Sequence, residues 1–213
     1  METRILYSDS AIAVCVKPAG VVSESGGMPE LLQAELGGAV YCVHRLDKAV
    51  GGVMVYARTK EAAASLSAAI ARRELHKEYL AVTEGVPREQ SGTLRDLLYH
   101  DAARNKSYVV TRPRRGVKEA LLDYELLGSA EHDAHPLSAL RILLRTGRSH
   151  QIRVQLASRG LPLVGDGKYG AVLRSCPLAL FSASLRFPHP LTGETLRFSA
   201  PPPAGFPWEL FKL

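Results

Sequence analysis

The sequence predicts an α+β domain built on a largely antiparallel sheet. Segments typical of strands and helices follow one another without the strict alternation that a doubly wound parallel sheet requires. Hydrophobic residues make up 46% of the 213 positions, enough to bury a core without disulfides or metals. No clear linker divides the chain, so we expect two lobes that share one continuous sheet rather than two separable domains.

The first predicted strands are short apolar runs. Residues 12–16 (IAVCV) are typical of a strand, and the segment 17–20 (KPAG) ends it, because Pro18 fixes a turn and cannot donate a ladder hydrogen bond. Residues 53–57 (VMVYA) indicate a second strand.

A helix should follow this second strand. Thr59 is a plausible N-cap, and the Ala-rich segment to about Arg73, with Leu66 and Ile70 four positions apart, predicts an amphipathic helix. Residues 79–82 (YLAV) indicate the next strand, ended by a glycine and a proline.

The middle of the chain is charged, with little apolar periodicity between residues 87 and 116, which favours an exposed hairpin or loop. Residues 119–127 and 137–145 carry runs compatible with strands. Residues 148–158 have Ile152 and Leu156 at helical spacing before a glycine stop.

The last third of the chain contains several prolines, at Pro188, Pro190 and positions 201–203. The apolar residues nevertheless alternate at 185 and 187 and again at 196 and 198, which predicts a pair of strands.

The amino-acid composition limits the classes of function that the chain can have. Cys15, Cys42 and Cys176 lie far apart with no metal-ligand spacing, which argues against a zinc site or disulfide framework and favours a reducing, cytoplasmic setting. No apolar run approaches the roughly 20 residues of a spanning helix, so we expect a soluble protein without an export signal. The net charge of +6 favours a polyanionic partner, although a basic surface that serves only solubility is the alternative.

Three polar clusters are candidates for chemistry. In residues 41–52 a carboxylate, Asp47, sits on a tight turn before a strand, where a scaffold can present a reactive group; it could equally be a turn former. Residues 145–153 (RTGRSHQIR) pack three guanidiniums, so either a nearby carboxylate such as Asp47 balances one of them or they form a solvated helix start. Residues 161–170 (LPLVGDGKYG) might cradle a phosphate, although a structural turn is favoured.

Taken together and in order, these blocks resemble the RluA family of RNA pseudouridine synthases across nearly the whole chain. The matching motifs are VKPAG (16–20), HRLD (44–47), KEYLA (77–81), TGRSHQIR (146–153) through GD (165–166) and YG (169–170), and LRFPHP (185–190) with TGE (192–194).

The resemblance implies the pseudouridine synthase fold: a mixed, largely antiparallel central sheet in two lobes, with flanking helices and an RNA-binding cleft. Residues 1–213 would form the catalytic domain, without the separate N-terminal RNA-binding domain that related sequences often carry. A monomer that binds structured ribosomal or transfer RNA, and needs no protein partner or membrane, is expected.

The resemblance also implies a reaction. A uridine would leave its stack and enter the cleft, where Asp47, as nucleophile or as the base that starts an elimination, would enable cleavage of the N1–C1′ bond. The uracil would turn, rejoin through C5 and lose the C5 proton, so that no cofactor and no metal is required.

Further site residues follow from the same resemblance. Tyr79 would stack on the base, although a strand tyrosine is ordinarily a core residue. Arg148 would pair with Asp47, and Ile152 would offer an apolar wall.

The remaining residues would contact RNA or orient the site. Arg45 is expected where the base leaves the helix, and His44 is expected to orient the turn. An RNA-backbone clamp and a solvated hairpin are both consistent with the basic side chains of the middle segment, Arg112, Arg114, Arg115 and Lys118.

The chain departs from the family pattern at three places. Val50-Gly51 stands where Thr-Ser is usual, Gln155 where histidine is common, and Phe181-Ser182 where His-Ala often occurs. We expect these changes to affect substrate fit more than activity.

Two other functions compete with this interpretation. One is a non-catalytic RNA-binding protein of the same fold that acts in ribosome assembly. The other is a hydrolytic, glycosidase-like enzyme, which would need a second acid to activate water, and Asp166 is the one candidate.

Overall fold

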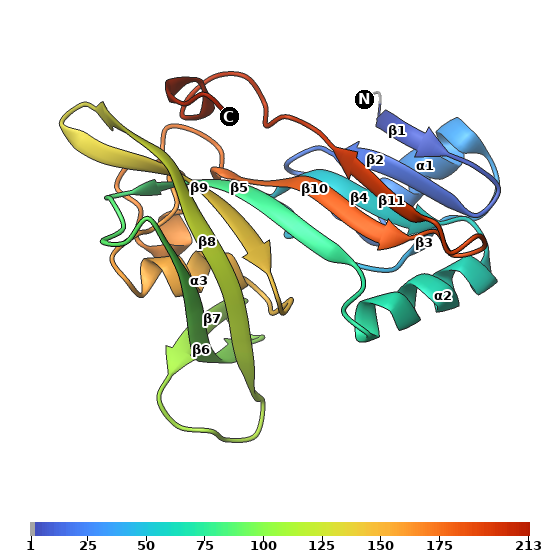
Figure 1. The fold of residues 1–213 in the computed structure, drawn as a ribbon, viewed down its shortest axis with the longest axis horizontal. Helices are drawn as coiled ribbons and strands as arrows, with labels where there is room; N and C mark the ends of the chain where they lie inside the picture. The colour runs from blue at the N-terminus through green and yellow to red at the C-terminus, as the bar shows by residue number, and fades with distance from the viewer. Residues whose placement is uncertain (1–2) are drawn as a thin grey trace. The chain divides into compact units, whose positions relative to one another are not determined.

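The computed structural model describes residues 3–213, and the chain divides into two compact units. The first unit contains the residues up to Glu78 together with Phe181–Pro201; the second contains Tyr79–Leu180 and Pro202–Leu213 (Figure 1). Both units combine strands with few helices, which confirms the predicted α+β class.

The first unit has the strand order β1-β2-β4-β10, with β11 paired to β10 and β3 paired to β4. Only β10 runs parallel to its neighbour β4 among these described pairs. The predicted C-terminal strand pair is confirmed, since Leu185 lies opposite Phe198 and Phe187 opposite Leu196. The bounds are β1 Arg4–Ser8, β2 Ile12–Lys17, β3 Tyr41–Cys42, β4 Gly51–Ala57, β10 Leu180–Pro188 and β11 Thr195–Ser199.

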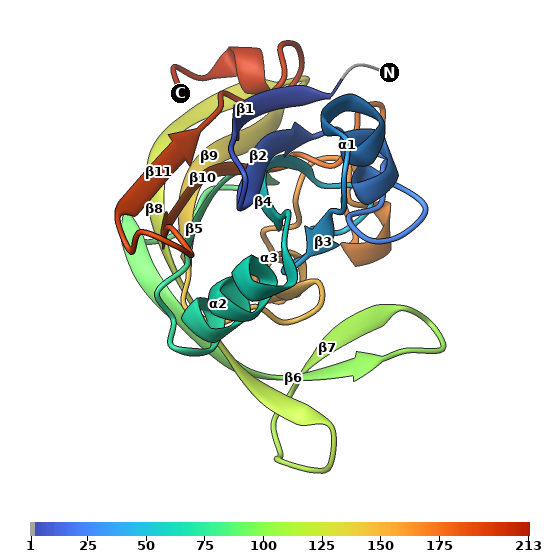
Figure 2. The ribbon, with the colours of Figure 1, turned by 90° about the vertical axis from the view of Figure 1, so that its right-hand side faces the viewer.

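Two helices of the described residues belong to this unit. They are labelled α1 and α2 in Figure 2. Helix α2 (Lys60–Ala71) begins as predicted, because the Thr59 side chain accepts a hydrogen bond from the Ala62 N–H at 3.1 Å. Helix α1 (Met28–Leu36) was not predicted from the sequence. Buried side chains from both helices, including Met28, Leu32 and Leu66, complete a core whose centre is the fully buried strand β4.

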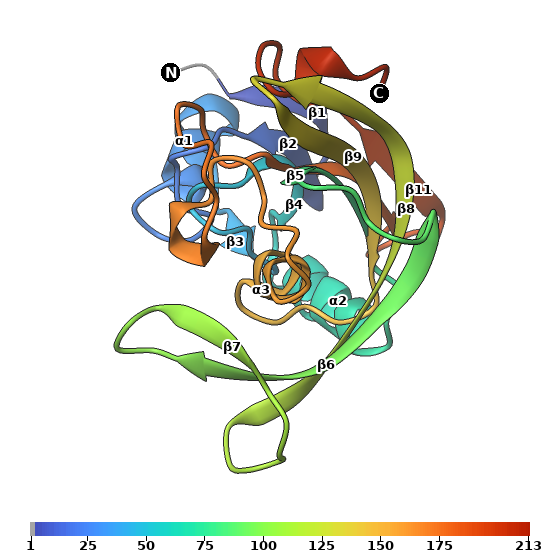
Figure 3. The same ribbon diagram turned by 90° about the vertical axis from the view of Figure 1, so that its left-hand side faces the viewer.

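The second unit has the strand order β5-β9-β8-β6-β7. Its long hairpin of β8 and β9, visible in Figure 3, confirms the two strands predicted after residue 119. A two-residue turn of Asp133 and Ala134, both with positive φ, joins them. The bounds are β5 His76–Glu84, β6 Ser91–Asp101, β7 Lys106–Val110, β8 Val117–His132 and β9 His135–Leu144.

Two expectations need correction here. The segment 87–116 is a hairpin, as one alternative had it, but β6 lies inside the sheet because it pairs with both β7 and β8. The predicted helix over 148–158 is shorter, α3 Gln151–Ala157, because His150 adopts a left-handed backbone conformation (φ 54°) just before it.

Two short 3₁₀ helices, η1 Gly167–Tyr169 and η2 Trp208–Leu210, complete the unit. Within residues 3–213, no helix is long and apolar enough to cross a membrane.

Candidate active site

Asp47 lies where the sequence predicted it, on a turn between β3 and β4 of the first unit. The Val50 N–H donates to the Asp47 carbonyl at 2.9 Å and closes the turn directly before β4 begins at Gly51. The Asp47 residue is half-buried, so the turn before a buried strand fixes its backbone while part of the residue stays accessible.

A neighbouring segment, residues 17–24, runs beside the Asp47 turn and braces it. The Gly20 N–H donates to the Lys48 carbonyl at 2.7 Å. The buried Ser23 hydroxyl donates to the Leu46 carbonyl and accepts from the Leu46 N–H, both at 3.0 Å. The backbone on both sides of Asp47 is therefore tied to the turn that follows β2.

Lys17 stabilises the contact between the Asp47 turn and the turn after β2 from inside the unit. Its buried ammonium donates to the carbonyls of Pro18 (2.9 Å), Val21 (2.6 Å) and Lys48 (3.3 Å). Burial lowers the pKa of Lys17 to about 8, and the negative charge of Asp47 opposes that shift. Lys17 was not singled out from the sequence, because a lysine before proline carries no sign of being buried.

His44 is bonded to the strand that follows the Asp47 turn. The ring is buried, and its Nε2 accepts from the Val55 N–H of β4 at 3.2 Å. Burial lowers the pKa of His44 well below its ordinary value, so the ring is neutral near pH 7. Arg45, by contrast, is exposed and forms an ion pair with Glu24 at 3.2 Å.

Two departures from the family pattern lie against each other in this unit. Phe181 of β10 is in parallel register with Gly51, and a Cβ added at Gly51 would lie 3.5 Å from the Phe181 ring and 3.3 Å from the Lys17 carbonyl. A serine hydroxyl at position 51 would extend further into this space. The small residue at 51 and the large residue at 181 therefore fit as a pair.

In the second unit, Arg148 is held at the start of α3. Its backbone N–H donates to the Gln151 side chain at 3.0 Å, and its Nε donates to the Glu119 carbonyl at 2.9 Å. Buried Gln151 also accepts from the Thr146 hydroxyl and donates to the Leu121 carbonyl, which fastens the segment to β8. Ile152, the predicted apolar wall, is buried in the same turn of helix.

The other two guanidiniums of the 145–153 segment have carboxylate partners of their own. Arg145 pairs with Asp123 at 2.6 Å. Arg153 forms two charge-assisted hydrogen bonds with Asp166, at 2.7 and 2.8 Å, in a pair that is almost fully buried. The positive charges of Arg145 and Arg153 are therefore balanced within the unit. The glycine-rich turn places Asp166 against Arg153 and has a structural role.

A polar network stabilises the left-handed residue before α3. The Tyr169 hydroxyl accepts from the Ser107 N–H at 2.8 Å and lies 2.9 Å from the His150 Nδ1. Ser107 in turn donates its hydroxyl to the Ser149 carbonyl at 2.6 Å. Burial raises the pKa of Tyr169, so its hydroxyl stays protonated. Sequence reasoning placed Tyr169 in a glycine-rich turn but did not assign it this role.

Tyr79 and the basic middle segment complete the predicted set. Tyr79 is buried in β5. We define the basic loop as the β7–β8 connection with the start of β8. Its four basic residues are exposed, and the Arg114 guanidinium packs over the Tyr99 ring at 4.5 Å. Its members are Arg112, Arg114, Arg115 and Lys118. The predicted pair of Asp47 with Arg148 joins residues of different units and stays a prediction.

Comparison with known proteins adds independent information. Residues 11–158 match the sequence profile of the family described as RNA pseudouridylate synthase. The chain is 34% identical to ribosomal large subunit pseudouridine synthase D of Xanthomonas campestris over 94% of this chain, and it spans 66% of that relative's length. It is 30% identical to the dual-specificity RNA pseudouridine synthase RluA of Haemophilus influenzae, over 92% of this chain and 91% of that protein.

A solved structure is similar as well. Human RNA pseudouridylate synthase domain containing 1 superposes with a TM-score of 0.83 at 25% sequence identity, covering 94% of this chain and 84% of the human chain.

Proposed function

The chain belongs to the RNA pseudouridylate synthase family and is therefore an isomerase that makes pseudouridine in RNA; we propose that Asp47 is its catalytic carboxylate and that its substrates are uridines in structured ribosomal or transfer RNA. The proposal places Tyr79, Arg148 and Ile152 around the target base, and Arg45 and the basic loop on the RNA backbone.

One observation carries the proposal for Asp47. Its carboxylate stands on a turn whose backbone is fixed on both sides, by Ser23 at Leu46 and by Gly20 and Lys17 at Lys48. Such fixation suits a group that must meet one carbon atom of a flipped nucleotide, because small errors of position cost large factors in rate.

The reaction balances without an added group. The N1–C1′ bond breaks while Asp47 attacks C1′ or removes a ribose proton, the detached uracil turns, and a C5–C1′ bond forms. As the C5–C1′ bond forms, the bond from Asp47 to C1′ breaks, or the abstracted ribose proton returns. The proton at C5 then leaves to solvent and N1 takes up one proton from solvent, so substrate and product have the same composition. We expect the His44 ring, whose Nε2 accepts from the Val55 N–H, to orient the turn and not to act as a proton shuttle.

The experiment that tests this function measures tritium release from RNA labelled at uridine C5. Wild-type protein is incubated separately with unmodified ribosomal and transfer RNA pools, and sequencing of the responding pool then locates the pseudouridine. Release from at least one pool is expected. No release from either folded pool, with RNA binding intact, would favour the non-catalytic RNA-binding alternative, and release of free uracil would favour the hydrolytic one.

The same proposal includes the setting in which the enzyme acts. We expect a monomer, because the large apolar side chains that are exposed in residues 3–213, such as Val86, Leu143 and Leu191, lie in separate parts of the chain. The three free cysteines support the proposed cytoplasmic setting. Sedimentation at the mass of one 23.1 kDa chain would support the monomeric state, and a stable dimer would contradict it.

A further inference from the structure

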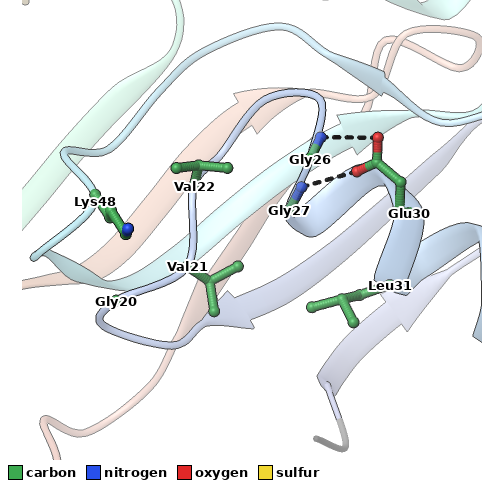
Figure 4. Close-up of a pocket in the computed structure, with 8 residues that line it drawn as sticks. All are labelled: Gly20, Val21, Val22, Gly26, Gly27, Glu30, Leu31 and Lys48. Atoms are coloured by element: carbon green, nitrogen blue, oxygen red, sulfur yellow. Dashed lines mark hydrogen bonds between the residues drawn. The ribbon is translucent and has the colours of Figure 1, made fainter.

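An open groove of about 600 Å³ lies beside the Asp47 turn, within the first unit. Its wall comes from the turn after β2 and from the start of α1, as Figure 4 shows. The residues that line it are Gly20, Val21, Val22, Gly26, Gly27, Glu30, Leu31 and Lys48. Its size is in the range of sites that hold small organic molecules.

The groove is continuous with the catalytic turn. Lys48 directly follows Asp47, and its carbonyl is bonded to the Gly20 N–H and to the Lys17 ammonium. The same ammonium holds the Val21 carbonyl at 2.6 Å. The buried Lys17 ammonium therefore holds both Val21, in the apolar wall, and Lys48, the residue after Asp47. A molecule in the groove would lie beside the turn that carries Asp47.

The groove has opposite charges at its two ends. Figure 4 shows Lys48 on one side and Glu30 on the other, with the valine side chains between them. The two Glu30 oxygens accept from the N–H groups of Gly26 and Gly27, both at 2.9 Å. These hydrogen bonds lower the pKa of Glu30, so it is an anion that still has lone pairs for further donors.

We propose that this groove binds the nucleotide next to the target uridine, with its phosphate at Lys48, its base against Val21, Val22 and Leu31, and its base edge at Glu30. The inference rests on the proposed function. A nucleotide matches the groove in polarity, because it has an anionic end, a flat apolar face and hydrogen-bond donors at the far edge. The reverse orientation would bring phosphate against the Glu30 carboxylate.

The carboxylate predicts a base preference. A carboxylate only accepts hydrogen bonds, so it favours edges that donate, such as the amino groups of cytosine and adenine or the paired N1–H and N2 amino group of guanine. Uracil presents one N–H between two carbonyl oxygens, which Glu30 repels. We therefore expect uridine to be the least favourable neighbour of the target.

The phosphate contact is tested with Lys48→Ala, Lys48→Arg and the matched control Lys60→Ala, which removes the same charge from an exposed site on α2 of the same unit. Lys48→Ala should raise KM for a short stem-loop RNA about fivefold or more with little change in kcat, and should reduce the slope of log Kd against log salt by about 0.7. Lys48→Arg should restore most of the loss, and Lys60→Ala should behave as wild type.

The base contact is tested with stem-loop RNAs that differ only in the nucleotide on the 5′ or on the 3′ side of the target, including an abasic residue at each. On one side, wild type should discriminate against uridine and the abasic site by about fivefold or more in kcat/KM. Glu30→Gln, whose amide both donates and accepts, should remove the discrimination against uridine and keep the discrimination against the abasic site, which depends on the apolar wall. Unchanged thermal unfolding of Glu30→Gln would exclude a folding defect.

The outcomes separate this inference from the proposed function. If wild type modifies the stem-loop but neither side shows a preference and Lys48→Ala keeps its KM and salt slope, the groove is not a nucleotide subsite. If the wild type forms no pseudouridine in any RNA, the proposed function itself fails. If Lys60→Ala raises KM as much as Lys48→Ala does, the increase comes from the loss of total positive charge and not from a contact at Lys48. That result would contradict the proposed subsite.

Discussion

Individual buried polar groups determine how the Asp47 turn is held. Asp47 itself could be predicted, because its block of sequence is distinctive and its place before a strand is readable. Lys17 and Ser23 could not, since their importance depends on carbonyls of residues 46 and 48, about 20 to 30 positions away. The same holds for Arg153, whose partner Asp166 becomes apparent only when α3 and the glycine-rich turn pack together.

The first residue-scale prediction concerns the electrostatic link between Asp47 and Lys17. Burial lowers the pKa of Lys17 to about 8, while the Asp47 anion stabilises the ammonium and raises it. In Asp47→Asn the pKa of Lys17, measured by NMR titration of labelled lysine, should therefore fall further below 8. An unchanged pKa of Lys17 in Asp47→Asn would refute the link.

The lowered pKa of Lys17 also determines how its contribution to folding stability changes with pH. The folded protein releases the Lys17 proton at a lower pH than the unfolded chain does, whose lysines titrate near 10.5. Between about pH 8 and that value the unfolded state binds more protons, so the contribution of Lys17 to folding stability rises with pH.

The second residue-scale prediction concerns Tyr169. Tyr169→Phe removes the acceptor of the buried Ser107 N–H and the partner of His150, so unfolding free energy should fall by about 1–3 kcal/mol. Urea denaturation measures this loss. Tyr124→Phe is the control, because its hydroxyl makes one long, exposed hydrogen bond of 3.4 Å to the Glu89 carbonyl. Equal losses in the two variants would contradict a special role for Tyr169.

Among the elements, those with a strong local pattern were predictable. Helix α2 has an N-cap and helical spacing, and β10 and β11 alternate despite their prolines. Helix α1 was missed because it is nine residues long and begins after two glycines rather than a side-chain cap. The position of β6 inside the sheet was not predicted, because its leucines do not alternate, and its extended conformation depends on pairing with β7 and β8 on its two sides.

The element-scale prediction concerns the basic loop. If it clamps the RNA backbone, Arg112→Ala, Arg115→Ala and Lys118→Ala combined should weaken RNA binding and reduce the slope of log Kd against log salt by about 2. The value of kcat at saturating RNA should stay near that of wild type. Arg114 is left intact, because its packing on Tyr99 would mix a structural effect with the lost charge.

A control of equal charge distinguishes the clamp from a general field. Lys60→Ala, Arg186→Ala and Arg197→Ala combined remove three positive charges from exposed sites of the first unit. A salt slope equal to that of the loop variant would show that total charge, and not the loop, governs binding. An unchanged slope in the loop variant would favour the solvated hairpin.

For the whole molecule, the sequence supports the fold class and the family better than the arrangement of the site. The α+β class follows from the mixed order of helices and strands, and the family from several motifs in fixed order. The proposed site is different, because Asp47 belongs to one unit, whereas Tyr79, Arg148 and the proposed base-contacting Ile152 belong to the other. Local patterns identify each member, but they carry no information about distances between units.

The most direct test of the central claim compares wild type with Asp47→Asn on one RNA that the wild type modifies. Asparagine keeps the size of the side chain and removes the carboxylate, so tritium release from uridine C5 should become undetectable while RNA affinity and thermal unfolding remain close to wild type. Tritium release by Asp47→Asn at a rate near that of wild type would contradict the assignment of Asp47 as the catalytic carboxylate.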